Sequence, residues 1–315
     1  MSDLIFDFLL FNRKPDYERL DRRQKIEVQL FIYIFGVINE QFEWKGLPDN
    51  IKPYNIEKVL NLYGQGVLFK YKDMFAFCNA VNSASLNIYG EPVQVQPIAI
   101  NGVAFDRVNV SNNIDNTGNI REQDAILIKN NLTSTPTYAM IKPLVEEIAF
   151  IWESKGINAG LSRVKALVHA NKNNATIIKQ QLKSIIGSAS MIPVVSEKTN
   201  ILKEIEKVDF NVEYEPDKYW EDFDKAFATL WQWLGITTNL SQNKKERLIV
   251  SEVESNDELT TISEDARLTF RKIGCESAKE LFGLDITCEN KVPQVKATQP
   301  MDNQDLNEDA DTQED

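Results

Sequence analysis

A helical repeat of apolar side chains is the clearest pattern along the chain. From Asp217 to Leu234, large apolar residues recur at spacings of three and four, which predicts an amphipathic helix that ends before Gly235. These residues are Trp220, Phe223, Phe227, Leu230, Trp231 and Leu234. Such an aromatic stripe indicates a packing face, in the core or between subunits.

A last helix is predicted to begin at the capping sequence Ser255–Glu258 and to end before Gly283. Its expected buried stripe consists of Leu259, Ile262, Ala266, Phe270 and Ile273. The polar residues between the two helices, Ile236–Val253, predict a loop. From Lys291 onward the chain is acidic and poor in apolar residues, so we expect that tail to be disordered.

The first half of the chain mixes helical and β-like stretches. Helices are predicted over Tyr17–Trp44 and over Pro53–Tyr63, the second with Gly64 as its stop signal. Between Asn87 and Asn131, Val and Ile mixed with Gly, Asn and Pro indicate strands, including a buried one at Ala125–Ile128. The apolar segment Leu4–Phe11 suits either a core element or an arm that docks on a partner.

The middle of the chain predicts another helix and a small mixed unit. The helix opens at Pro136 and Thr137 and is expected to end at Gly156 and Gly160. Pro143 lies inside it and predicts a bend or a later start. A strand, a helix and a strand follow at Arg163–His169, Thr176–Ile186 and Ile192–Val195. The whole pattern predicts an α+β protein that is mainly α.

Composition narrows the class of function. The chain has 315 residues, 43% of them hydrophobic, which allows a sizeable core. Its net charge of −12 argues against tight binding of nucleic acid, because neutralising phosphates supplies most of such affinity. The three cysteines share no C-x-x-C spacing and indicate reduced thiols. The longest apolar run, Leu30–Ile38, is too short to span a bilayer.

Candidate catalytic chemistry is sparse. The single histidine, His169, has no nucleophile or metal partner near it in the sequence, so a structural role is the simpler interpretation. No phosphate-binding GxxxxGK[ST] motif and no ligand set with zinc or calcium spacing occurs. We interpret Gly64-Gln65-Gly66 as a turn and the pairs Glu146-Glu147 and Glu221-Asp222 as solvated helix faces. A site built on two distant carboxylates stays open.

Two stretches resemble the upper collar, or connector and portal, protein of phi29-type podoviruses. The first is Phe42–Pro53, followed by Glu57-Lys58 and Tyr63-Gly64. The second comprises Trp233–Ile236, Lys244–Arg247 and Glu252–Glu258. Thr135–Thr137 and Glu280–Leu284 are also similar, and all these anchors occur in the family's order. The resemblance therefore reaches from about residue 40 to residue 290.

The resemblance implies a dodecameric ring at a capsid vertex, made of long stem helices, a helical wing and a β-containing clip. The implied parts are a wing from 1–135 and 257–290, stem helices at 136–156 and 216–235, a clip at 157–215, and a tunnel loop at 236–256. Residues 291–315 would remain as the acidic tail. Twelve helices packed at roughly 8–10 Å would enclose a bore of roughly 28 Å, wide enough for double-stranded DNA.

The same resemblance implies how DNA and partners would be handled. Lys218 matches a channel-facing lysine of the family, and Lys244, Lys245 and Arg247 match its tunnel-loop basic cluster. These cations would hold DNA loosely inside an acidic bore, without catalysis, metal or cofactor. The implied partners are other copies of the chain, the major capsid protein, the packaging ATPase and the lower collar or tail protein, all in the virion and none in a membrane.

This chain departs from the family at several points. Its N-terminus is apolar. The family's N-terminus is basic, and that basic segment is implicated in docking a packaging RNA. Asp209 falls near a second family lysine, and Pro143 has no counterpart. Two other readings stay open: a different ring component of the neck or tail, and a phage enzyme with a carboxylate-based site.

Overall fold

The computed structural model describes residues 6, 9–11, 16–161, 215–236 and 250–291. For residues 160–161 and 250–262 the backbone alone is described. The chain divides into two compact units. Unit 1 contains residues 1–15, 31–142 and 230–315, and unit 2 contains residues 16–30 and 143–229.

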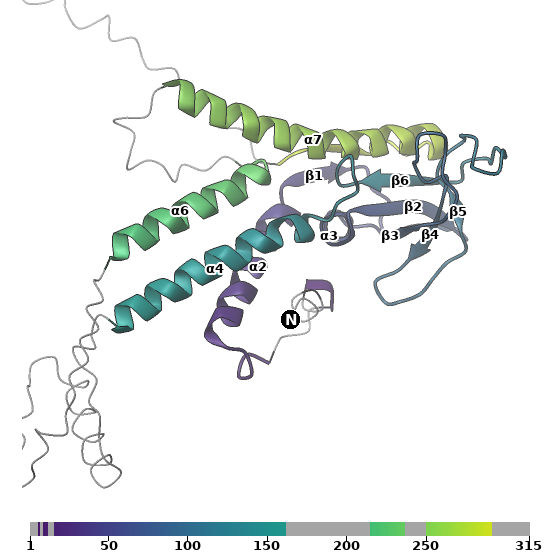
Figure 1. Cartoon of the computed structure of the whole chain (residues 1–315). Helices are drawn as coiled ribbons and strands as arrows, with labels where there is room; N and C mark the ends of the chain where they lie inside the picture. The colour runs from purple at the N-terminus through teal and green to yellow at the C-terminus, as the bar shows by residue number, and fades with distance from the viewer. Residues whose placement is uncertain (1–5, 7–8, 12–15, 162–214, 237–249, 292–315) are drawn as a thin grey trace, which may run out of the picture. The chain divides into compact units, whose positions relative to one another are not determined.

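Unit 1 is built on an antiparallel five-stranded sheet in the order β5-β4-β3-β2-β6 (Figure 1). The strands are β2 Gln65–Tyr71, β3 Met74–Asn82, β4 Gln94–Ile98, β5 Val108–Asn109 and β6 Ala125–Lys129. Strand β2 lies inside the sheet and is buried from Gln65 to Phe69. Gly66 is required there because an added Cβ would lie 2.3 Å from the ring of Phe77.

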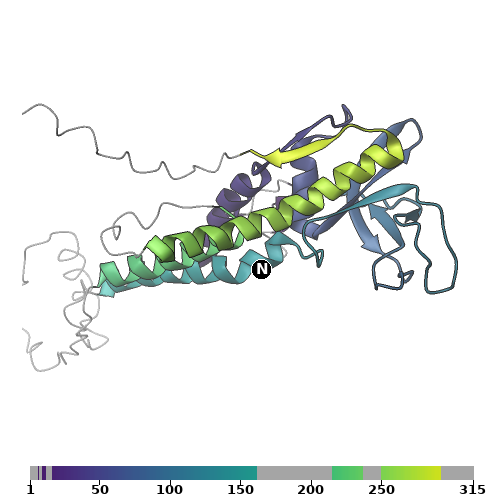
Figure 2. The same cartoon turned by 90° about the horizontal axis from the view of Figure 1, so that it is seen from above.

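Helix α7, Val250–Phe282, packs on β6 and on the final strand β7, Thr287–Asn290 (Figures 1 and 2). Strand β7 pairs antiparallel with β1, Phe42–Lys45, so the last described residues join a strand from the start of the chain. Helix α3, Pro53–Tyr63, packs against β2 and β3. The apolar core therefore combines early strands with the last helix, as its members Trp44, Leu60, Ile128 and Cys275 illustrate.

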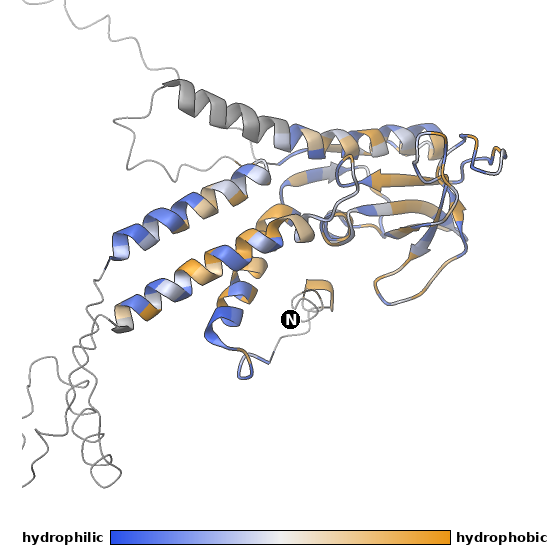
Figure 3. Ribbon diagram, viewed as in Figure 1, coloured by the Kyte–Doolittle hydropathy of each residue, from blue (hydrophilic) through white to orange (hydrophobic). Residues whose placement is uncertain are grey.

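Three further helices have parts in both units. They are α2 Arg22–Asn39, α4 Thr137–Leu161 and α6 Pro216–Trp233. In α4 the division between the units falls at Pro143, inside the helix. The bend expected at that proline stays a prediction. By hydropathy α6 is mostly hydrophilic, whereas β6 is mostly hydrophobic (Figure 3).

Several elements lie where the sequence pattern predicts them. Helix α3 spans Pro53–Tyr63, and Gly64 ends it in the left-handed conformation with φ of +84°. Gly235 and Gly283, which follow α6 and α7, also have positive φ. The mixture of helix and antiparallel sheet agrees with the α+β class.

Other predictions about helix ends are wrong. The helix over Tyr17–Trp44 stops at Asn39, since Phe42–Lys45 forms β1 with alternate side chains buried. Helix α4 continues through Gly156, where an added Cβ would lie 2.4 Å from the Arg22 guanidinium, so this glycine permits a close approach instead of ending the helix. Gly64-Gln65-Gly66 is no simple turn, because Gln65 already begins β2.

The prediction for α7 is wrong at its start and in its face. The helix begins at Val250, so Ser255–Glu258 lies inside it; Ser, Asn and Asp cost only some tenths of a kcal/mol each in a helix interior. Of the predicted stripe, Ala266 is exposed and Ile273 is 48% exposed. The buried face carries Glu264, Arg267, Leu268, Arg271, Cys275 and Ala278 instead.

The predicted strand, helix and strand at 163–169, 176–186 and 192–195, with His169, lie outside the described residues, as do residues 237–249 of the predicted loop and the tail after Lys291. The loop prediction is wrong over residues 250–253, which begin α7.

Candidate functional site

Of the basic residues expected to contact DNA, only Lys218 is among the described residues; Lys244, Lys245 and Arg247 are outside them. Lys218 lies in the first turn of α6 with a side chain that is largely exposed. It forms an ion pair with Glu215, three residues earlier. A polyanion approaching this lysine would therefore meet a charge that is already partly compensated.

Acidic side chains dominate the exposed surface of α6. The helix carries Asp217, Glu221, Asp222, Asp224, Lys218 and Lys225, all exposed, for a net charge of −2. Lys225 lies 3.8 Å from Asp222, so the second lysine is also paired locally. Repulsion of a polyanion is the property that this arrangement gives to the surface.

Aromatic packing explains why that acidic surface faces outward. In unit 2, Trp220 and Phe223 of α6 contact Trp152 of α4, with ring centroids 6.1 and 5.2 Å from it. The Lys155 ammonium lies 3.3 Å from the Trp220 ring centroid, close enough for a cation–π interaction. The predicted packing face is thus confirmed for Phe223, whereas Trp220 contacts Trp152 and remains 41% exposed.

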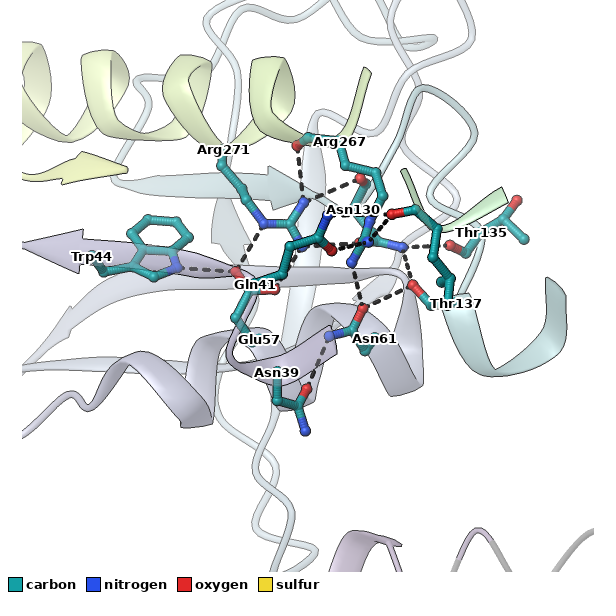
Figure 4. A network of polar contacts seen from close by, with 11 residues as sticks. Asn39, Gln41, Trp44, Glu57, Asn61, Asn130, Thr135, Thr137, Arg267 and Arg271 are labelled. Carbon is teal, nitrogen blue, oxygen red and sulfur yellow. Dashed lines mark hydrogen bonds and ion pairs between the residues drawn. The ribbon is translucent and has the colours of Figure 1, made fainter. Parts of the chain in front are cut away.

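A buried ion pair lies at the centre of unit 1 (Figure 4). Arg271 of α7 donates from Nε and Nη2 to the two carboxylate oxygens of Glu57 in α3, at 2.8 and 2.7 Å. Both side chains have no exposed surface. Arg271 also donates to the Asn130 side chain and to the backbone carbonyls of Arg267 and Asn130, so all of its N–H groups have acceptors. Trp44 Nε1 donates to the same carboxylate at 2.9 Å.

A second buried arginine extends this network toward the ends of α6 and α4. Arg267 donates to Gln41 Oε1 at 2.6 Å, to the carbonyl of Leu234 at 3.3 Å and to Asn61 Oδ1 at 3.0 Å. Thr137, the first residue of α4, donates to the same Asn61 oxygen at 2.8 Å. Burial, and then the neighbouring Arg271, lowers the pKa of Arg267 to about 9, so the group is still charged at neutral pH.

The sequence pattern did not identify this network. Arg267 and Arg271 are four residues apart and therefore lie on one helix face, but neither belongs to the apolar stripe predicted for this helix. The available signal was a glutamate, Glu57, on a face of α3 whose other buried residues are apolar except for Asn61. Two arginines four residues apart and one acidic residue on a buried helix face are compatible with a buried ion pair.

Sites for other chemistry are limited in the described part of the chain. An apolar cavity of about 10 Å³ between α7 and the sheet, lined by residues such as Trp44 and Cys275, has room for about one water molecule. Burial raises the pKa of the Cys275 thiol to about 12, which removes it as a nucleophile at neutral pH. Among the described residues, no group of three His, Cys, Asp or Glu side chains is arranged to hold a metal ion. Their helices also include none of the length and apolarity needed to cross a bilayer.

Comparisons with known proteins complete the description of the chain. A protein-family model described as Phage Connector (GP10) matches residues 16–294. A chain from the portal and tail of native bacteriophage P68 is 15% identical with a TM-score of 0.45, and the match covers 87% of this chain and 89% of that one. A chain from the neck of an empty gene transfer agent particle is 10% identical with a TM-score of 0.39, covering 90% of this chain and 86% of that one.

Proposed function

The chain belongs to the phage connector (GP10) family, and from this premise we propose that twelve copies form a closed ring through which double-stranded DNA enters and leaves a capsid. The portal, or connector, function and a place in the neck of the virion follow from the family itself. The subunit number and a close kinship with phi29-type connectors belong to the proposal. No covalent step is assigned to the protein.

The acidic surface of α6 is the observation that carries the proposal. Its six exposed charged side chains sum to −2, and both lysines are paired with carboxylates within the same helix or just before it. In a ring of twelve, this helix alone would contribute about 24 net negative charges. A wall of that kind repels phosphates, so DNA slides past without binding to it.

We assign the parts of the subunit by the same reasoning. The stem helices are 136–156 and 216–235, the clip is 157–215, and the tunnel loop is 236–256, of which residues 250–256 form the first turns of α7. The wing combines 1–135 with 257–290, and the pairing of β1 with β7 and the packing of α7 on β6 support that combination. Residues 291–315 form an acidic tail.

The basic residues then act as weak, salt-sensitive contacts. Lys218 would touch DNA from the stem, and Lys244, Lys245 and Arg247 from the tunnel loop. Because Lys218 is paired with Glu215, we expect it to contribute less to DNA retention than the loop residues do. The ring would bind the major capsid protein, the packaging ATPase during filling and the lower collar or tail protein afterwards.

Light scattering of the purified protein with negative-stain images tests the ring. A particle near twelve times 36.0 kDa with a central hole is the expected result. A stable monomer or dimer would contradict it and reopen the interpretation as a phage enzyme. Another closed ring with a different subunit number would refute the count of twelve alone.

Charge reversal tests the role of α6. Rings carrying Glu221→Lys and Asp224→Lys are expected to gain DNA affinity and a steeper dependence of log K on log salt than wild type. The matched control carries Asp49→Lys and Asp106→Lys, which makes the same charge change at exposed positions in unit 1. An equal gain in both double variants would show that net charge alone acts, and would remove α6 from the channel.

A further inference from the structure

Two hairpins of unit 1 turn in the same way. Asn87 begins one turn and Asp115 the other, and the side-chain oxygen of each accepts hydrogen bonds from the backbone N–H groups two and four residues later, at 2.8–2.9 Å. Gly90 and Gly118 take the left-handed position in the two turns, with φ of +78° and +81°. One side-chain oxygen of each residue thus holds the turn that the residue begins, and the second oxygen of Asp115 accepts from Ser85 of the other hairpin.

The hairpins also pair with each other. Asn87 bridges Asp115, while Leu86 bridges Pro92 and Ile114 bridges Ile120 within their own hairpins. Directly opposite residues of antiparallel strands point to the same side, and consecutive residues point to opposite sides. The two bridged apolar pairs therefore lie on one side of this small sheet, and the two Asx side chains lie on the other.

This arrangement is inverted with respect to a usual half-buried sheet, because its polar side is the buried one. Asn87 is 7% exposed and Asp115 4% exposed. On the other side and at the first turn, five apolar residues are exposed by between 38% and 76% of their surface. This hairpin patch consists of Leu86, Ile88, Tyr89, Ile114 and Ile120.

The size of the hairpin patch marks it as a contact surface. Ile88 and Tyr89 are each 76% exposed, and Ile120 is 68% exposed. The five residues together offer on the order of 500 Å², close to the largest apolar patches that monomeric proteins leave uncovered. About 800 Å² per partner is buried in a stable protein–protein interface, so the patch would supply most of one side of such an interface.

We propose that the hairpin patch packs against the neighbouring copy of this chain in the ring, an inference that rests on the proposed function. In a closed cyclic ring every subunit meets its neighbour in the same way, so one contact covers all patches equally. A second copy can therefore cover the patch on every subunit.

The charges around the patch suit an interface edge. Glu91 is paired with Lys129 at 3.0 Å, and Arg121 lies 3.5 Å from Asp115. Charged groups that already have partners within the chain can remain at a solvated rim while the apolar centre is buried. The patch thus has the apolar centre and the polar rim of a protein–protein contact.

A double variant, Ile88→Asp with Ile120→Asp, tests the proposal by native mass spectrometry and light scattering. We expect rings to give way to smaller species, with at least a tenfold rise in the protein concentration at half-dissociation. Leu132→Asp is the matched control, because Leu132 is 74% exposed and lies outside the patch; its rings should keep the wild-type mass. Circular dichroism of the separated subunits checks that the double variant is folded.

A second measurement does not depend on the folding of that variant. A photo-cross-linking benzoylphenylalanine in place of Tyr89 should yield a covalent dimer of this chain. Double-variant rings with wild-type mass and wild-type half-dissociation would overturn the proposal, as would cross-links confined to one chain. Intact rings that fail only to enter capsids would assign the patch to the shell protein instead. If wild type itself forms no ring, the proposed function fails together with this inference.

Discussion

Replacing Glu57 by Gln removes the carboxylate that Arg271 contacts in the described part of the chain, with little change of shape. In the native protein Arg271 donates twice to Glu57, and both groups lie completely inside unit 1. The variant leaves two arginine cations in the interior, with Arg267 in the same network. Removing one partner of a buried pair costs about 3–5 kcal/mol, because the other charge stays buried without compensation.

A double-mutant cycle with Arg271→Met separates the pair from its surroundings. Arg271→Met alone leaves Glu57 as a buried anion that keeps the hydrogen bond from Trp44. The double variant contains neither charge. We therefore expect its loss of unfolding free energy to be smaller than the sum of the two single losses by at least about 2 kcal/mol. Urea unfolding at one fixed protein concentration measures each variant, since assembly couples stability to concentration.

Two results would refute this account of the core. One is a loss below about 1 kcal/mol for Glu57→Gln, which would match an exposed pair. The other is additivity of the two single substitutions. Lys45→Ala is the control, because the Lys45–Glu289 pair is more than half exposed on both sides and should contribute less than about 1 kcal/mol.

Two further predictions concern glycines and acid. Gly235→Ala should lower the free energy of unfolding by about 3 kcal/mol, because φ is +70° and the added Cβ would lie 2.6 Å from the α7 backbone. Gly118→Ala, where φ is +81° but the added Cβ meets open space, should lower it by about 1 kcal/mol. Thermal or urea unfolding measures both, and equal losses would contradict the close packing at Gly235. The Thr117 hydroxyl and nearby backbone amides lower the pKa of Asp115 to about 2, so this carboxylate stabilises the fold above about pH 4 and loses that effect as pH falls toward 2. The melting temperatures of wild type and Asp115→Asn should therefore converge over that window, and a constant difference would contradict the assignment.

Local signals in the sequence predicted the elements that depend on local chemistry. Proline at the first turn and a left-handed glycine after the last fix α3 within its own sequence. The aromatic residues of α6 likewise recur every three or four residues, which is the repeat of an amphipathic helix. In these elements the residue types determine the backbone without help from distant parts of the chain.

Contacts with distant parts of the chain determine the structural features that the sequence pattern did not predict. Phe42–Lys45 is a strand because Thr287–Asn290 pairs with it, and the two segments lie more than 200 residues apart. The face of α7 was misjudged because Arg271 is buried by an acid in α3, which its own helix does not reveal. Three basic residues of the predicted DNA surface, Lys244, Lys245 and Arg247, still rest on family resemblance.

The polar core also explains how the long helices can be held in fixed register on unit 1. Hydrogen bonds have directional geometry, whereas apolar contacts allow a helix to shift along its axis with little change in buried area. Gln41 and Arg267 both donate to the carbonyl of Leu234, the residue after α6, and Asn130 and Asn61 hold Thr137, the residue that begins α4. Satisfying these donors and acceptors fixes where each helix starts or ends, so any displacement leaves buried polar groups unpaired. If α4 and α6 are the stem helices of the proposed ring, force applied along them would have to break several buried hydrogen bonds together before either end could slip.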